Sequence, residues 1–209
     1  MLYIHFFIIP SILLVPEETQ MKLISLRLFI IAMVTLLFAG CLTVDKKEYY
    51  YKVNNDGSGE GWIKFYNIKS AKDGEEDVSL KDFAELIDDY VKGTKFEDDN
   101  PSLQVVSKDL KEEDGKLNGL VKFKFNSLSE ISFLYEEGCG CAPVYYSMGG
   151  FLSETFEKSN GTYLGEGGGP QIIKWPAGTK EFSFTTTVST DTNSVDLLNQ
   201  YNAWKANQK

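Results

Sequence analysis

One short apolar segment near the N-terminus determines which part of this 209-residue chain can fold as a globular domain. The run from Leu28 to Phe38 follows a cationic start, Met21 to Arg27, and leads through two small residues to Cys41. This order of charged, apolar and small residues is the layout of a secretory signal. The apolar run has 11 residues, whereas a helix that spans a bilayer needs about 20. We therefore predict that residues 21–40 are a removable signal and that the folded domain follows them.

The end of this segment carries a motif. Phe38-Ala39-Gly40-Cys41 resembles the lipobox of bacterial lipoprotein precursors, although Phe38 stands where Leu is usual. The resemblance implies that the chain is cut before Cys41 and that this cysteine carries fatty acids. The alternative is an ordinary signal peptide with an incidental cysteine. We interpret residues 1–20 as an overextended start of the reading frame, and a double signal is the alternative there.

Lipid on Cys41 would tie the chain to a membrane of the bacterial cell envelope, because two or three acyl chains hold a protein far more firmly than one. Leu42 follows the cysteine where an Asp would, by resemblance to Gram-negative lipoproteins, argue against the outer membrane. We expect residues 41–47 to form a lipidated tether and residues 48–209 to form a single exported ectodomain. The membrane is thus the first expected partner, and a lipid or another envelope protein is the second.

The segment after Cys41 lacks two side chains on which many sites depend. The only histidine is His5 and the only arginine is Arg27, and both precede the expected cleavage point. A Ser–His–Asp triad, a Cys–His pair and a histidine-ligated zinc site are thereby excluded. The chain is also acidic, which disfavours nucleic acid as a partner. The sequence singles out no catalytic residue, metal site or cofactor, and hydrolysis by paired carboxylates stays open because such pairs form in space.

Cys139 and Cys141 are the two thiols that remain. An exported compartment permits a disulfide between them, although the C-x-C ring is small and strained. Three interpretations stay open: a local disulfide or spare thiols in a loop, a redox or metal-handling pair, and an intermolecular bridge. Glu136 and Glu137 disfavour a reactive thiol because nearby negative charge opposes thiolate formation.

Hydrophobic periodicity predicts an α+β fold. Strand-like runs at 48–54 and 62–68 flank a turn rich in Gly, Asp and Asn, as in a β-hairpin. Apolar residues at helical spacing predict a helix over Leu80–Val91, and strand-like runs at 103–110 and 117–125 follow it. The first half is therefore β-β-α-β-β, an antiparallel sheet of hairpins with one helix packed on it.

The second half is less regular. Short strands are expected at 144–146, 151–156, 162–164 and 171–175, and strict alternation predicts a strand at 182–188. A short C-terminal helix would start near residues 190–193 and carry the apolar positions Val195, Leu198, Tyr201 and Trp204.

The order of lipobox, strand, Asp56-Gly57-Ser58-Gly59 turn, strand, helix and β-pair resembles the uncharacterised LppM-like envelope lipoproteins. That group is linked to a helix-grip-like ectodomain that binds lipid. The missing histidine and arginine side chains and the expected membrane address favour a non-enzymatic binding or structural module, and the resemblance implies a lipid or another amphiphile as its ligand. The alternative is a thiol redox or metal-handling protein that uses Cys139 and Cys141.

Overall fold

The computed structural model of the protein describes residues 42–71, 77–136, 141–148, 154–188 and 193–208. By its internal contacts the chain divides into residues 1–40 and 41–209, and the fold below is that of the second unit. It confirms the α+β class, with three antiparallel sheets, one long helix and a short C-terminal helix. In the described ranges, no helix combines the length and the apolar character needed to cross a membrane.

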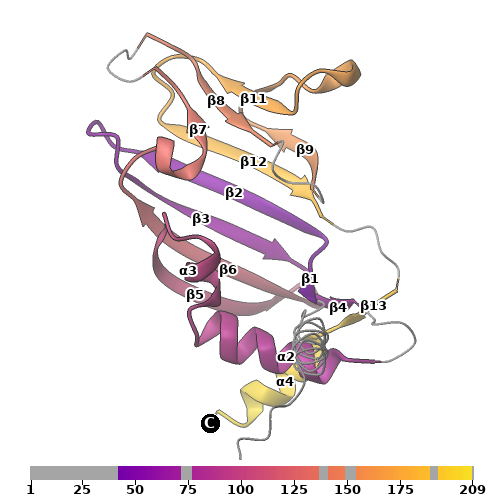
Figure 1. Cartoon of the computed structure of the whole chain (residues 1–209). Coiled ribbons are helices and arrows are strands. Elements are labelled where there is room, and N and C mark those ends of the chain that lie inside the picture. Colours follow the sequence, from indigo (N-terminus) through magenta and orange to yellow (C-terminus); the bar gives the residue numbers. More distant parts are fainter. Residues whose placement is uncertain (1–41, 72–76, 137–140, 149–153, 189–192, 209) are drawn as a thin grey trace, which may run out of the picture. The chain divides into compact units, whose positions relative to one another are not determined.

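Six strands form the main sheet in the order β5-β6-β3-β2-β12-β9 (Figure 1). Their bounds are β2 Lys46–Val53, β3 Gly59–Tyr66, β5 Gln104–Glu113, β6 Lys116–Phe125, β9 Thr155–Ser159 and β12 Glu181–Thr187. Both predicted hairpins are present, because β2 pairs with β3 and β5 pairs with β6. β3 and β6 join the two hairpins, and β12 adds to the free edge of β2.

Two smaller sheets complete the strands. The three-stranded sheet has the order β1-β4-β13, and the four-stranded sheet has the order β10-β11-β8-β7. Their bounds are β1 Leu42–Thr43, β4 Lys69–Ala71, β13 Ser194–Asp196, β7 Phe133–Leu134, β8 Val144–Ser147, β10 Thr162–Tyr163 and β11 Ile172–Trp175. The expected strand at 151–156 lies partly outside the described residues.

The stretch expected to be a tether, residues 41–47, belongs to the folded domain from Leu42 onward. Leu42 pairs with Ser70 of β4, and Lys46 pairs with Tyr66 of β3. β1 pairs with β4, which is not its neighbour in sequence. The alternation of side chains within residues 41–47 therefore does not predict this pairing. The described fold therefore includes Leu42–Thr43 as β1 and begins before Glu48.

The predicted long helix is present as α2 (Ser79–Glu85), which continues into a π-helical segment, η1 (Leu86–Val91). Leu86 and Ile87 are buried as expected, but Leu80 is 77% exposed, so its assignment to the apolar stripe was wrong. The first turn instead buries Asp82, whose carboxylate accepts a hydrogen bond from Ser70 Oγ at 2.6 Å. A polar contact to β4 therefore sets the rotation of this turn.

The other helices are short. They are α3 (Lys95–Asp99), the single turns η2 (Ser129–Ile131) and η3 (Glu166–Gly168), and α4 (Leu198–Ala206). α3 was not predicted. α4 confirms the C-terminal helix but starts later than expected, because Val195 lies in β13 instead. Most of the start expected at 190–193 lies outside the described residues.

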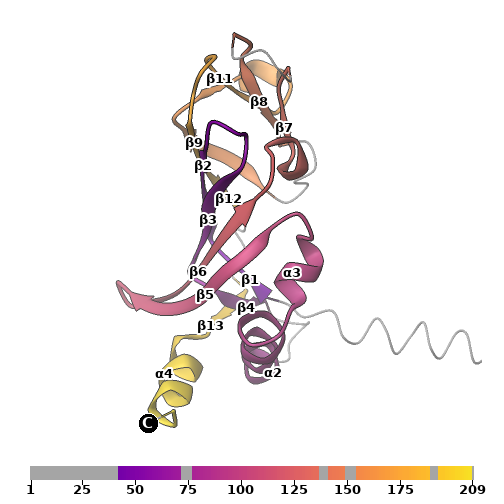
Figure 2. The same cartoon turned by 90° about the vertical axis from the view of Figure 1, so that its left-hand side faces the viewer.

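Buried side chains form two clusters. The aromatic cluster lies between the main sheet and the four-stranded sheet and contains Tyr51, Phe123, Phe133, Trp175, Phe182 and Phe184. The helical cluster lies among α2, η1, the small N-terminal strands and α4 and contains Val44, Ile68, Ile87, Leu117, Leu197 and Tyr201. Phe65 and Tyr90 pack against both clusters. The view in Figure 2 shows α2 and α3 on the same side of β5 and β6.

Candidate ligand-binding pocket

A pocket of about 880 Å³ lies where the aromatic and helical clusters meet. One wall is a single face of the main sheet, because alternate residues of a strand share a face. Tyr49 and Tyr51 of β2 and Ile63 and Phe65 of β3 line this wall. The volume is within the range of roughly 300–1,000 Å³ that small-molecule sites occupy.

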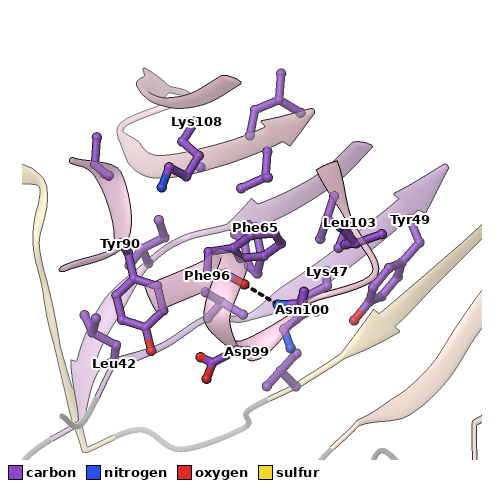
Figure 3. A pocket seen from close by; sticks show the side chains of 18 of the residues that line it. Leu42, Lys47, Tyr49, Phe65, Tyr90, Phe96, Asp99, Asn100, Leu103 and Lys108 are labelled. Atoms are coloured by element: carbon purple, nitrogen blue, oxygen red, sulfur yellow. Dashed lines mark hydrogen bonds between the residues drawn. The ribbon is translucent and has the colours of Figure 1, made fainter. Parts of the chain in front are cut away.

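The facing wall comes from the helical side of the domain. It consists of Leu86, Tyr90 and Val91 of η1, Phe96 of α3 and the segment 99–103 that follows α3. Figure 3 shows the rings of Phe65 and Phe96 together in the middle of the pocket, and an edge-to-face contact joins them at a centroid distance of 6.4 Å. The walls are thus largely aliphatic and aromatic, as in pockets that hold apolar ligands.

A buried carboxylate stands behind one part of this wall. Glu154 accepts hydrogen bonds from the Tyr49 hydroxyl at 3.0 Å and from Thr186 Oγ1 at 2.6 Å. Lys47 Nζ lies 2.7 Å from its other oxygen. The Glu154 side chain is only 3% exposed, so the lysine and the two hydroxyls replace the water that this charge has lost. We call Glu154, Lys47, Tyr49 and Thr186 the Glu154 cluster.

The phenols beside this cluster stay protonated. Burial raises the pKa of Tyr49 far above its ordinary value, and the charge of Glu154 raises it further. Burial is also the main cause of the raised pKa values of Tyr51 and Tyr146, which hydrogen-bond to each other. At neutral pH these hydroxyls are therefore neutral hydrogen-bonding groups rather than bases.

The pocket has a second polar region at α3 and β5. Asn100 Nδ2 donates to Phe96 O at 2.8 Å (Figure 3), which closes the C-terminal end of α3. Lys108 Nζ donates to Gly93 O at 2.6 Å and pairs with the Glu97 carboxylate at 2.8 Å. Burial raises the pKa of the Tyr90 phenol; the nearby Lys95 ammonium lowers that pKa, and the carboxylate of Asp99, at the end of α3, raises it.

Of the three cysteines singled out in the sequence, the structure describes one. Cys41 and Cys139 lie outside the described residues. Cys141 is exposed and is disulfide-bonded, with its partner outside the described part, so the Cys139–Cys141 pairing stays a prediction. The described residues contain no group of three or more His, Cys, Asp and Glu side chains able to hold a metal ion. Leu42, the residue that follows Cys41 in the sequence, lines the pocket.

Sequence reasoning missed the residues that give the pocket its polar groups. Lys47 and Glu154 are 107 positions apart and meet only because β12 and β9 add to the edge of β2. Asp99 and Asn100 lie between the predicted helix and the predicted strand at 103–110, where no element was expected. Lys47 belongs to the stretch that was expected to be a tether, so the sequence carried no local signal that it had a buried partner.

Comparisons of the chain with protein families, with curated proteins and with solved structures find no match. Function is therefore inferred from the geometry and the charge of the pocket itself.

Proposed function

We propose that this chain is a lipid-anchored protein of the bacterial cell envelope whose ectodomain binds a lipid or another amphiphile. The observation that carries the proposal is the pocket of about 880 Å³ between the two buried clusters. Its apolar walls suit an acyl chain, since each buried methylene contributes about 0.8 kcal/mol. The Glu154 cluster and the region around Asp99 and Asn100 offer hydrogen bonds to a polar head.

The position of the pocket fits a membrane-bound protein. Leu42, Thr43 and Val44 line it, and they directly follow the cysteine proposed to carry the lipid. β1 holds Leu42 by pairing it with Ser70, so little free chain separates the pocket from the anchor. A protein built in this way takes up its ligand near the bilayer surface, where amphiphiles are concentrated.

The anchor is tested by intact-mass analysis of the full-length protein purified from its bacterial host. We expect the loss of residues 1–40 and the added mass of a diacylglyceryl group and a further acyl chain on Cys41. The Cys41→Ser variant is the control and should carry no lipid mass. A wild-type chain that keeps its leader, or that carries no fatty acid at position 41, contradicts the anchor.

The ligand is tested by lipid analysis of the full-length protein after mild detergent extraction. Leu103→Trp places a large ring at a lining position on the segment after α3, and we expect it to remove a co-purified amphiphile that the wild type retains. Val106→Trp is the matched control, because Val106 is close in sequence, 61% exposed and not part of the wall. Equal lipid content in both variants would count against the pocket.

A further inference from the structure

We infer that the pocket selects amphiphiles whose head group carries no net negative charge, either uncharged hydroxyl-bearing heads or cationic ones. This inference rests on the proposed function, because it names the ligand class of the same pocket. The charges around the ligand come from lining residues and from the carboxylates paired with them. The lining residues are Lys47, Lys108, Asp99, Asp109 and Glu130, and the paired carboxylates are Glu154 and Glu97.

The cations of the wall are already paired. Among the described lining residues only Lys47 and Lys108 carry a positive charge. Lys47 Nζ lies 2.7 Å from Glu154, and Lys108 Nζ lies 2.8 Å from Glu97 and also donates to Gly93 O. Both pairs are largely removed from water, with lysine side chains 25% and 13% exposed. An anionic head that takes Lys47 from its pair would leave the buried Glu154 carboxylate without its cation. One that takes Lys108 would displace the Glu97 carboxylate, which is 31% exposed, and would therefore meet a smaller penalty.

The remaining charges of the wall are negative. Asp99, Asp109 and Glu130 line the pocket, and all three are exposed at its edge. The described residues form no ion pair with Asp99 or Glu130. Figure 3 shows the Asp99 carboxylate and the Tyr90 hydroxyl pointing to the same part of the pocket. Lys95, which is not part of the wall, also contacts the Tyr90 phenol, but its ammonium is paired with the Glu85 carboxylate. The unpaired charges at this edge are therefore negative, and they repel a carboxylate or a phosphate and attract an ammonium group.

Neutral hydrogen-bonding groups complete the same edge. The Tyr90 hydroxyl accepts from the Lys95 ammonium and can donate its own proton. The Asn100 side-chain oxygen is an acceptor, and one N–H of the same amide donates to Phe96 O. A glycerol head presents hydroxyl groups that match both. No guanidinium reinforces the two lysines, because Arg27 is the only arginine of the chain. Charge and hydrogen bonding therefore favour the same class of head group.

The experiment uses three photoactivatable amphiphiles that share one diazirine-bearing acyl chain and differ only in the head: a carboxylate, a glycerol ester and a quaternary ammonium. Each is added to membranes that contain the full-length protein, and labelling of β2, β3 and α3 peptides is measured per probe partitioned into the membrane. We expect the carboxylate probe to label the pocket about tenfold less than the other two, the effect of roughly 1.4 kcal/mol of repulsion.

The charge-reversal variant Asp99→Lys tests the cause. It should raise carboxylate labelling and lower ammonium labelling, and a lysine at the C-terminal end of α3 is compatible with the helix dipole. Asp89→Lys changes the net charge equally at an exposed residue outside the wall and should leave the preference unchanged. Equal labelling by all three heads, or the same shift in both variants, overturns the inference. Absence of pocket labelling by every probe contradicts the proposed function instead.

Discussion

Glu154 is a buried carboxylate whose charge is balanced by partners on two strands. Lys47 and Tyr49 reach it from β2, and Thr186 reaches it from β12. The ion pair and the hydrogen bonds of Glu154 mainly offset the cost of burying its charge, so their net contribution to the free energy of folding is small. What the cluster determines is register, since a shift of β12 by one residue along β2 would turn Thr186 to the other face.

Glu154→Ala should lower the free energy of unfolding by roughly 2–3 kcal/mol, because it leaves the Lys47 ammonium half-buried without its carboxylate. Glu157→Ala is the matched control. Glu157 pairs with Lys46 at 3.5 Å, and both side chains are more than a third exposed, so its loss should change the free energy by less than about 0.5 kcal/mol. Urea denaturation of the two variants measures the difference, and equal effects would show that the cluster is not a stabilising unit.

A second carboxylate makes the stability of the fold depend on pH. Glu113 lies 2.6 Å from Lys64 Nζ and also accepts from Asn118 and Lys111. Its bond to Lys64 is the largest cause of a pKa that falls from 4.5 to about 2. Because the folded state binds this proton less readily than the unfolded state, Glu113 stabilises the fold above pH 4.5 and loses that effect as the pH falls towards 2.

The Glu113→Gln variant should therefore lose less stability than the wild type between pH 5 and 2, while both still respond to other carboxylates. Denaturant midpoints measured across that window give the two curves. Curves that run parallel over the whole range would mean that Glu113 is not ionised more readily in the folded state.

At the scale of elements, the helix formed by α2 and η1 shows how one face combines polar and apolar contacts. Its first turn is attached to β4 through Asp82 and Ser70, and its later turns bury Leu86 and Ile87 in the helical cluster. The same later turns present Tyr90 to the pocket. The packing of Ile87 therefore supports the position of a pocket wall as well as the fold.

Ile87→Ala should cost roughly 2–4 kcal/mol, because Ile87 is 3% exposed and its removal leaves a cavity. Leu80→Ala, on the same helix but 77% exposed, should change stability by no more than about 0.5 kcal/mol. Thermal and urea unfolding of both variants check the contrast. A large effect of Leu80→Ala would show that this leucine is covered by a partner in solution.

At the scale of the whole folded domain, the pocket is the place where two separate clusters of buried side chains come together. Phe65 and Tyr90 contact both clusters and line the pocket. A ligand there would touch the sheet and the helical side at once. Its binding should therefore stabilise the folded domain as one cooperative unit.

An uncharged glycerol amphiphile at about 100 times its dissociation constant should raise the free energy of unfolding by about 2.7 kcal/mol. Leu103→Trp should abolish this increase, and Val106→Trp should keep it, because only Leu103 lines the pocket. Thermal unfolding with and without the amphiphile measures the effect. An equal increase in both variants would place the binding elsewhere on the protein.

The local sequence pattern was enough to predict those strands and helices whose hydrophobic residues repeat at a regular spacing. The hairpin partners β2 and β3, the pair β5 and β6, the helix over Leu80–Val91 and the strand β12 were all predicted, because alternation and helical spacing repeat within a few residues. The α+β class followed from their order. The proposed signal and Cys41 also depend on local sequence alone, and they remain predictions.

The pocket and its charges were decided by tertiary structure. Leu42 pairs with Ser70, Lys47 meets Glu154, and Leu80 turns outward because Asp82 bonds to Ser70. Each of these outcomes joins residues that are distant in sequence or depends on the order β5-β6-β3-β2-β12-β9. Such contacts form through strand register and packing across the chain, and hydrophobic periodicity along one segment contains no information about them.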